Sequence, residues 1–391
     1  MENEIDLKLQ PSCIEISKSA LENNLKFIRE RIGDGVKISS VIKGNAYGHG
    51  IETFLPMAER CGISHFSVFS ADEALKALRA RTKAHTHVMI MGLIADEALE
   101  WAIENDVSFY VFEMGRLRHA VEAAGKVGRK ARIHLQLETG MHRIGFEPEE
   151  HEEIIRILHQ HPDRLKLEGI CTHFAGAESV ANYVRIQQQK KRFRDAVEVF
   201  RKEFPEIPAI HAANSAAMLG YPDTIYNMVR IGIAQYGFWP SREVYMLLKK
   251  EDRQKGKDPL KRILRWTSKV MSVKEVEEGE FVGYGNIHMT NRKERIASVP
   301  IGYAHGFGRN LTNTGFVLIR GERAKVVGLV NMNMLTVDVT DIEGVRKGDE
   351  VVIVGIQGER EITLAAFGEL SNNLNYEVLV RLPADLPRLV V

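Results

Sequence analysis

Cysteine, net charge and long apolar runs are all scarce in this sequence, and each scarcity excludes a class of protein. Only 3 of the 391 residues are cysteine, too few for a disulfide framework or a zinc-binding pattern. The 53 basic and 52 acidic residues leave a formal net charge of +1, which gives no reason to expect nucleic acid or an anionic membrane as a partner. No segment reaches the ~18 apolar residues of a membrane helix, and the N-terminus lacks an apolar signal segment. We therefore expect a cytoplasmic protein without a metal site.

The first 240 residues alternate between short apolar runs and helix-like segments. Eight strand-like runs occur, at 37–43, 65–70, 87–92, 107–112, 132–138, 167–174, 209–215 and 228–237. Helical periodicity is found at 17–32, 71–81, 95–105, 114–125, 149–160 and 184–204. Eight strands alternating with helices predict an α/β protein with a (β/α)8 barrel. A doubly wound sheet is the alternative, but the first strand–helix turn lacks the G-x-G-x-x-G pattern.

The character of the chain changes after residue 240. Residues 241–262 are rich in lysine and arginine and predict an exposed helix or loop at a domain boundary. From 263 onward, short alternating runs are separated by turn signals, which predicts a mostly β domain. We expect a barrel over 12–240 and a β-rich domain over 241–391, with residues 1–11 a candidate for an additional strand of that domain.

Residues that follow the apolar runs are the candidates for chemistry, because barrel active sites lie at the C-terminal ends of the strands. Lys43 ends the first run, in VIKGNAYGHG. It is either a side chain that reaches out to solvent or a reactive amine, since a buried ammonium group is costly. His173 lies at the end of the sixth run and is either structural or functional. Ser215 ends the seventh run, and Gly232 lies in the eighth.

The last two strands of such barrels commonly supply a phosphate site. The N–H groups of Gly232 and Ile233, with the Ser215 hydroxyl, can hold a phosphate dianion. Together with Lys43 and an arginine from the last run, this pattern suggests pyridoxal phosphate bound as a Schiff base.

Several motifs, in order along nearly the whole chain, resemble the alanine racemase family. They are VIKGNAYGHG (41–50), LETGMHRIGF (137–146), CTHFAGAE (171–178), HAANSAA (211–217), VRIGIAQYG (229–237), VGYGN (282–286), VPIGYAHGFGR (299–309), GLVNMNM (328–334) and the NYEV…LPR tail (375–388). The resemblance implies a pyridoxal-phosphate barrel enzyme that works as a homodimer with shared active sites.

The resemblance also implies a role for each matching residue. Lys43 and the partner subunit's Tyr284 would be the two catalytic bases, and Arg230 would hydrogen-bond the pyridine nitrogen. The implied cofactor contacts are Lys43, Tyr47, His173, Ser215, Arg230, Gly232 and Ile233, and His173 would tune the tyrosine through Arg230. The implied substrate contacts are Arg143 and the Met332 N–H, and the implied entrance residues are Tyr303 and Arg309.

Five positions depart from the family pattern. Gln136 stands where many members have a carbamylated lysine, so we expect its amide oxygen or a bound anion to orient Arg143. Ala384 aligns with a tyrosine that narrows the substrate pocket, which predicts a wider specificity. The remaining departures are Asn331, Asn333 and Leu329, whose effect the sequence does not decide.

The resemblance implies interconversion of L- and D-alanine as the function. The first alternative is a broader racemase acting on serine or larger side chains. More distant alternatives are an amino-acid decarboxylase, an aldolase-like enzyme or a non-catalytic carrier of the cofactor. Arg230 disfavours the decarboxylase, because those enzymes place a carboxylate at the pyridine nitrogen. Supply of peptidoglycan precursors and catabolism both remain open.

Overall fold

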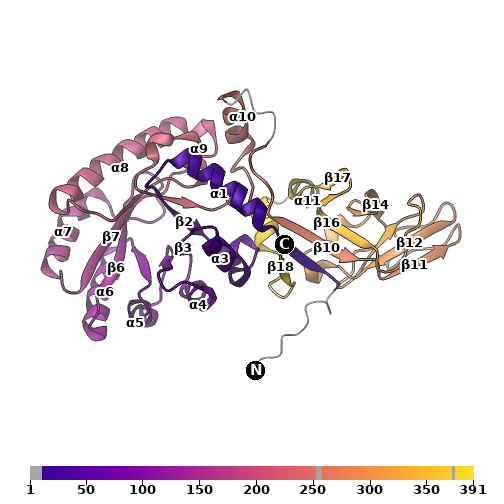
Figure 1. The fold of residues 1–391 in the computed structure, drawn as a ribbon, viewed down its shortest axis with the longest axis horizontal. Helices are drawn as coiled ribbons and strands as arrows, with labels where there is room; N and C mark the ends of the chain where they lie inside the picture. The colour runs from indigo at the N-terminus through magenta and orange to yellow at the C-terminus, as the bar shows by residue number, and fades with distance from the viewer. Residues whose placement is uncertain (1–10, 252–257, 372–374) are drawn as a thin grey trace. The chain divides into compact units, whose positions relative to one another are not determined.

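The computed structural model describes residues 11–251, 258–371 and 375–391, and these form two compact units (Figure 1). The barrel unit comprises residues 19–44 and 54–261. The β unit comprises residues 11–18, 45–53 and 262–391. By contacts the chain therefore divides near 261/262, and the segment 45–53 groups with the β unit. The expected boundary at 240/241 stays a prediction about domains.

Eight parallel strands form the barrel sheet, in the order β8-β7-β6-β5-β4-β3-β2-β9. They are β2 (Lys37–Val41), β3 (His65–Val68), β4 (His87–Ile90), β5 (Ser108–Val111), β6 (Ala131–Gln136), β7 (Leu165–Cys171), β8 (Ala209–His211) and β9 (Met228–Ile231). The two end strands approach each other, since the Arg230 N–H donates to the Ala213 carbonyl at 2.9 Å. The sheet is thus nearly closed. This confirms the predicted barrel, and the doubly wound alternative is wrong.

Helices precede or follow the barrel strands along the chain (Figure 1). They are α1 (Lys18–Ile32), α3 (Ile51–Arg60), α4 (Ala71–Ala80), α5 (Leu99–Glu104), α6 (Met114–Val127), α7 (His151–Gln160), α8 (Tyr183–Glu203), α9 (Ser215–Gly220) and α10 (Arg242–Glu251). Helix α1 buries Leu21, Leu25 and Ile28, which share one face at helical spacing. Helices α3 and α9 were not predicted, because α3 contains Pro56 and α9 has only six residues.

The basic segment after residue 240 begins with α10, as expected of an exposed boundary helix. Its first turn exposes Arg242 and Glu243, while Val244 and Leu248 are buried. Residues 252–257 of the segment lie outside the described residues.

The β unit is built on a sheet in the order β11-β12-β15-β14-β13-β16-β10-β1-β18, with β17 paired to β16. The strands are β1 (Cys13–Ile16), β10 (Leu264–Lys269), β11 (Ser272–Val276), β12 (Glu294–Val299), β13 (Phe316–Ile319), β14 (Glu322–Val326), β15 (Leu335–Asp338), β16 (Glu350–Gln357), β17 (Arg360–Ile362) and β18 (Arg388–Val390). Helices α11 (Leu364–Ser371) and α12 (Asn375–Val380) precede β18. The early strand β1 joins this sheet, antiparallel to β10 and parallel to β18. The expected additional strand within residues 1–11 falls almost wholly outside the described residues.

Among the described residues, no helix combines the length and apolarity that crossing a bilayer requires. Within the same residues, no group of three or more histidine, cysteine or acidic side chains is arranged to hold a metal ion.

One partly buried ion-pair cluster links neighbouring barrel strands near their N-terminal ends. Glu168 on β7 accepts from Arg132 Nε at 3.1 Å and contacts Lys166 Nζ at 3.0 Å. Arg132 also pairs with Asp106 at 2.7 Å. Burial raises the pKa of Glu168, but hydrogen bonds from Arg132 and Lys166 outweigh it and lower the pKa to about 2. The charged form of Glu168 is therefore stabilised by folding.

We predict that Glu168→Gln lowers the free energy of unfolding at pH 7 by roughly 2–3 kcal/mol. The folded pKa is depressed, so the contribution is present above the unfolded value near 4.5 and is lost as pH falls towards 2. Urea denaturation at pH 7, 4 and 3 measures the difference between variant and parent. Glu153→Gln is the control, because its pair with Arg118 is exposed and is worth at most about 1 kcal/mol. A pH-independent difference at Glu168 would contradict this account.

Candidate active site

An unusual backbone turn follows strand β2 and begins at Lys43. Helix α2 (Lys43–Tyr47) is left-handed, with φ values of 63° at Gly44, 53° at Asn45, 55° at Ala46 and 51° at Tyr47. Left-handed conformation costs a non-glycine residue about 1–2 kcal/mol. Three such residues in succession are strain of the kind that proteins retain at functional sites.

Local hydrogen bonds hold the end of this turn in place within the β unit. The Asn45 side-chain oxygen accepts from the Ile51 N–H at 3.1 Å, and the Arg388 guanidinium donates to the Gly48 carbonyl at 2.9 Å. Gly48 has φ 78°, and a Cβ there would lie 1.9 Å from the Leu379 carbonyl oxygen. Only glycine fits at this position.

The Lys43 amine has an altered electrostatic environment at the C-terminal mouth of the barrel. Its side chain reaches solvent, but surrounding protein removes part of its hydration. This desolvation lowers the pKa of Lys43, Arg143 and Arg230 lower it further, and Glu73 partly opposes them. A lowered pKa increases the fraction of neutral amine near pH 7, which is the form able to accept a proton.

Arg230 on β9 is buried and held by four hydrogen bonds. Its Nη1 donates to His211 Nδ1 at 2.5 Å and to the His211 carbonyl at 2.7 Å. Its Nη2 donates to the carbonyls of Thr172 at 2.7 Å and Ala212 at 3.1 Å. An arginine has five N–H donors, so these bonds use all four on the terminal nitrogens. The Nε–H makes no hydrogen bond with any described residue.

The predicted phosphate residues of the barrel unit lie together. Asn214 caps α9 by accepting from the Ala217 N–H at 2.9 Å, and Ser215 is the first residue of the helix. The Ser215 hydroxyl accepts from the Gly232 N–H at 3.1 Å, which joins the ends of β8 and β9. Ile233 follows directly. Backbone N–H groups at such a turn suit an anion.

The loop after β6, which carries Arg143, is folded around the carboxylate of Glu138. That carboxylate accepts from the backbone N–H groups of Gly140, of Met141 at 2.7 Å and of His142 at 2.9 Å. Burial raises the pKa of Glu138, but these donors outweigh it and the net pKa is lowered. Arg143 is exposed and therefore able to meet an incoming anion.

Gln136 contacts this loop but forms no hydrogen bond with Arg143 among the described residues. Its amide nitrogen donates to the Ile144 carbonyl at 3.2 Å, and the side chain is buried. The amide therefore supports the residue next to Arg143. The expected orientation of Arg143 by the amide oxygen or by an anion stays a prediction.

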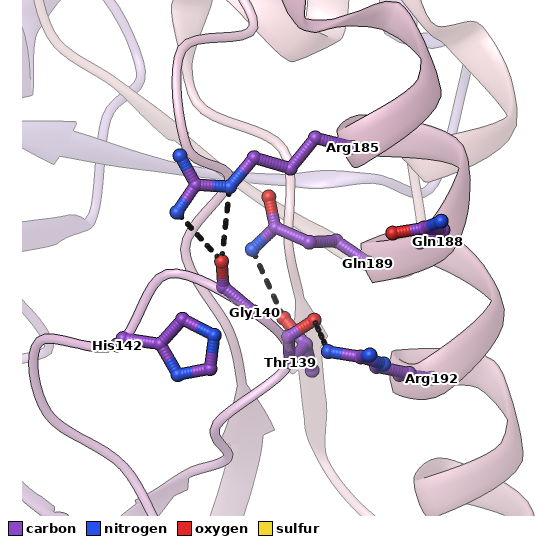
Figure 2. A pocket seen from close by; sticks show the side chains of 7 residues that line it. All are labelled: Thr139, Gly140, His142, Arg185, Gln188, Gln189 and Arg192. Carbon is purple, nitrogen blue, oxygen red and sulfur yellow. Dashed lines mark hydrogen bonds between the residues drawn. The ribbon is translucent and has the colours of Figure 1, made fainter.

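Helix α8 also contacts the loop after β6, and residues of both line a cavity of about 340 Å³ (Figure 2). The buried Gln189 donates to Thr139 Oγ1 at 3.2 Å and to the His173 carbonyl at 3.1 Å. Its amide oxygen accepts from the Ala175 N–H at 2.8 Å. Arg185 donates to the Gly140 carbonyl at 2.8 Å. One helix thus fixes the loops after both β6 and β7.

His173 lies in the loop after β7 and does not hydrogen-bond Arg230 among the described residues. Burial lowers the pKa of His173 to about 3, with further lowering by Arg230, Arg143 and Lys43. Its expected link to the tyrosine through Arg230 stays a prediction. The histidine that contacts Arg230 is His211, which sequence reasoning missed. Its position at the end of a buried run, in HAANS, was the available signal.

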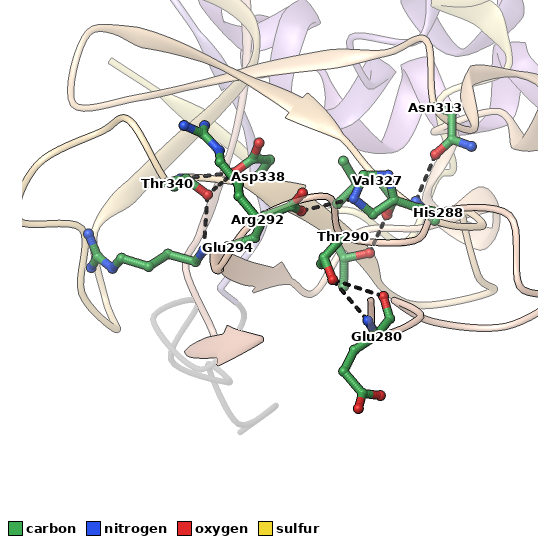
Figure 3. A network of polar contacts seen from close by, with 12 residues as sticks. Glu280, His288, Thr290, Arg292, Glu294, Asn313, Val327, Asp338 and Thr340 are labelled. Atoms are coloured by element: carbon green, nitrogen blue, oxygen red, sulfur yellow. Dashed lines mark hydrogen bonds and ion pairs between the residues drawn. The ribbon is translucent and has the colours of Figure 1, made fainter. Parts of the chain in front are cut away.

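In the β unit, Tyr284 is carried on a well-supported hairpin. The two arms meet at a bridge between Phe281 and Met289. His288 on the returning arm donates to Glu294 at 2.9 Å (Figure 3). Thr290 closes the base, because its hydroxyl accepts from the Glu280 N–H at 3.0 Å (Figure 3).

The tip of this hairpin presents Tyr284 to the outside. Gly283, Gly285 and Asn286 have φ values of 76°, 78° and 48°, which let the chain turn sharply on both sides of the tyrosine. Tyr284 is 71% exposed. A fixed backbone with an exposed phenol is suited to reaching another molecule.

The remaining predicted residues also lie in the β unit. The Tyr303 N–H donates to the Asn331 carbonyl at 3.0 Å, and the Ala304 N–H donates to the Met332 carbonyl at 3.0 Å. The backbone therefore places Tyr303 beside Met332. Exposed side chains are found at Arg309, Asn333 and Ala384. Tyr47 is buried, and the centroid of its ring lies 6.1 Å from that of Tyr376. Leu329 lies next to Gly285.

Comparisons with known proteins find relatives that match this chain in both the barrel unit and the β unit. The family model "Alanine racemase, N-terminal domain" matches residues 16–240, and "Alanine racemase, C-terminal domain" matches residues 263–390. Alanine racemase of Methanococcus maripaludis is 35% identical over 381 residues, which is 97% of this chain and 98% of that protein. Alanine racemase 1 of Caldanaerobacter subterraneus subsp. tengcongensis is 33% identical over 97% of this chain and 95% of its own length. The solved alanine racemase of Clostridium difficile 630 superposes with a TM-score of 0.87 at 32% identity, covering 97% of this chain and 96% of that one.

Fold and site together define an enzyme built on a barrel, with a lysine at the mouth and an accompanying β domain. The chain belongs to the alanine racemase family and is an isomerase of that family. The predicted family membership and enzyme class are thereby confirmed.

We predict that Gln189→Leu lowers the free energy of unfolding by about 1–3 kcal/mol, because it leaves buried groups of both supported loops unpaired. Urea denaturation measures the change. Gln188→Leu is the matched control: that side chain is exposed, lines the same cavity and forms no hydrogen bond among the described residues. Its effect should stay within about 0.5 kcal/mol. Equal effects of the two changes would show that α8 does not support the loops through Gln189.

Proposed function

We propose that this protein racemises a small amino acid with pyridoxal phosphate, and that its main reaction is the interconversion of L- and D-alanine. The observation that carries the proposal is Arg230, whose Nε–H is the one guanidinium donor left without a partner among the described residues. Family membership supports the same reaction.

The residues present fit the cofactor. Lys43 offers an amine of lowered pKa for a covalent bond to an aldehyde. The Ser215 hydroxyl and the Ile233 N–H would donate to a phosphate, and the Gly232 N–H, which donates to Ser215 Oγ here, would turn to the phosphate when it binds. Tyr47 would add a phenol. The bound cofactor supplies an electron sink that stabilises negative charge at the substrate α-carbon.

Arg230 limits how strongly that sink acts. A guanidinium does not give up its proton, so it can hydrogen-bond a ring nitrogen without protonating it. A carboxylate at the same place would favour a protonated ring and a stronger sink. We infer that Arg230 favours simple proton removal and return over decarboxylation, which makes the decarboxylase alternative a poor fit.

Racemisation needs one base on each face of the α-carbon. We propose Lys43 Nζ for one face and Tyr284 Oη of the partner subunit for the other. Tyr284 is exposed on its hairpin and is accompanied by exposed apolar side chains at Phe281, Ile287 and Met289. Such a patch suits burial against a second copy of the chain in a homodimer with shared sites.

Binding and orientation fall to further residues. Arg143 would pair with the substrate carboxylate, which the Met332 N–H would also hold. His173 would act on the proton of Tyr284. Tyr303 and Arg309 would line the entrance. The cytoplasmic location and a role in D-alanine supply remain predictions from the sequence.

A broader substrate range is the second candidate, and Ala384 is the reason for it. A tyrosine expected at this position would fill space that the exposed methyl group of Ala384 leaves open. The extra space would admit serine or a larger side chain. The polarity nearby also differs from the family pattern at Asn331, Asn333 and Leu329. These three residues give no prediction about substrate range.

Replacing Tyr284 with phenylalanine tests the two-base reaction. We expect racemisation to fall by about 100- to 10,000-fold, because one general base is lost. Lys43 still serves its own face, so one alanine enantiomer should keep exchanging its α-proton with deuterated solvent. The cofactor absorbance should persist. Tyr245→Phe on α10 is the control and should leave the rate unchanged. Unimpaired racemisation in the Tyr284 variant would reject this assignment.

Substrate range is tested by kcat/KM for L-alanine, L-serine and L-lysine in the parent and in Ala384→Tyr. We expect measurable turnover of L-serine by the parent. In Ala384→Tyr, the kcat/KM for L-serine should fall relative to that for L-alanine, because the phenol ring fills the space. An alanine preference above about 1,000-fold in the parent would reject the broader range, since a missing side-chain contact rarely discriminates so strongly.

A further inference from the structure

A chain of three buried side chains runs through the interior of the barrel from Arg230. Arg230 Nη1 lies 2.5 Å from His211 Nδ1, and His211 Nε2 lies 3.0 Å from His134 Nδ1. The residue exposures are 4% for Arg230 and 0% for both histidines. The three residues come from β9, β8 and β6, so the chain links three strands of the barrel.

Each proton in this chain is determined by its neighbour. Arginine only donates, so His211 Nδ1 must accept and its proton must be on Nε2. That Nε2–H then donates to His134, whose Nδ1 must accept in turn. Burial lowers the pKa of His134 to about 3 and lowers that of His211 well below 6.5, which keeps both rings neutral. Two neutral imidazoles leave a single consistent assignment, with both protons on Nε2.

Two backbone features place His134 for this contact. The pairing of β6 with β7 shifts register between Ile133 and His134, and such irregularities redirect a side chain. Opposite it, Gly169 leaves room for the ring, because a Cβ there would lie 2.4 Å from His134 Nδ1. The His134 and His211 rings then meet edge to face, at 71° and 5.1 Å between centroids.

Stability alone does not account for His134. Its Nε2–H is buried and has no hydrogen-bond partner among the described residues. A buried donor without a hydrogen-bond partner destabilises the folded state. Only the Nδ1 atom of this ring forms a hydrogen bond among the described residues, and that bond is the contact with His211.

We propose that His134 is a positioning residue: by accepting from His211, it fixes the His211 tautomer that anchors Arg230 Nη1 and leaves the Arg230 Nε–H directed at the cofactor ring. This inference rests on the proposed function of Arg230. Without the His134 Nδ1 acceptor, His211 can carry its proton on Nδ1 instead of Nε2. The Nδ1–H would then face the Arg230 Nη1–H groups, and no hydrogen bond could form between these two donors. Arg230 would then lose an anchor that none of its backbone contacts replaces.

The tautomers themselves are the first test. Solid-state ¹⁵N NMR of histidine-labelled holoenzyme distinguishes protonated from unprotonated ring nitrogens, and single variants at 134 and 211 assign the signals. We expect Nε2–H for both residues. A proton on Nδ1 of either ring would overturn the proposal, whether or not the enzyme racemises anything. Failure of the parent holoenzyme to racemise any amino acid would instead reject the proposed function.

Paired variants are the second test. His134→Leu removes the acceptor, whereas His134→Asn keeps an oxygen near the Nδ1 position. We expect His134→Leu to lower kcat about tenfold with KM nearly unchanged and to shift the cofactor absorbance band. We expect His134→Asn to stay within about threefold of the parent.

His151→Leu is the control for a lost buried ring. His151 is also buried with an unpartnered Nε2, but it lies on α7 against Phe200. Its change should leave kcat and the absorbance band unaltered. A parent-like kcat and band in His134→Leu would overturn the proposal. If that variant does not fold, a tenfold loss of kcat in folded His134→Asn with the His211 proton still on Nε2 would overturn it as well.

Discussion

The hydrogen bonds that hold the Arg230 guanidinium in place are the interactions on which the rest of the site depends. It draws together the ends of three strands, because it donates to carbonyls that follow β7 and β8 while lying on β9 itself. A buried charge is costly unless hydrogen bonds compensate it, and here no carboxylate does so. The carbonyls and one imidazole provide the compensation instead. Desolvation and Arg143 are the main causes that lower the pKa of the Lys43 amine, and the charge of Arg230 lowers it further.

Much of the fold followed from the sequence, because its signals are strong and local. The eight apolar runs correspond to the eight barrel strands, and the alternating apolar and polar residues after residue 263 correspond to strands of the second sheet. Helix α3 was missed because Pro56 interrupts a pattern that tertiary packing restores. Motif resemblance supplied Lys43, Arg230 and Tyr284, whereas His211, His134 and Gln189 are visible only once the strands close. Their roles come from contacts 14 to 77 residues apart in the chain, which periodicity does not encode.

Strain at the mouth of the barrel is compensated by contacts that lie elsewhere in the sequence. The left-handed turn after Lys43 places three non-glycine residues at positive φ. Arg388, more than 300 residues away, donates to the carbonyl of Gly48. Leu379 packs so closely on Gly48 that no side chain fits there. The C-terminal segment thus helps to hold Gly48, at the end of the turn that begins at Lys43.

In the proposed reaction, the two units would hold their reacting groups in different ways. The barrel holds its polar groups in a buried network, in which each donor limits the next. The β unit holds Tyr284 differently, with a rigid hairpin backbone and a side chain left open. A base that serves its own chain can be buried at folding, but one that serves a second chain must stay exposed until the subunits meet. The exposure of Tyr284 is therefore what the proposed shared site would require, and the hydrogen bonds at the hairpin base would reduce the ordering cost if two subunits associate there.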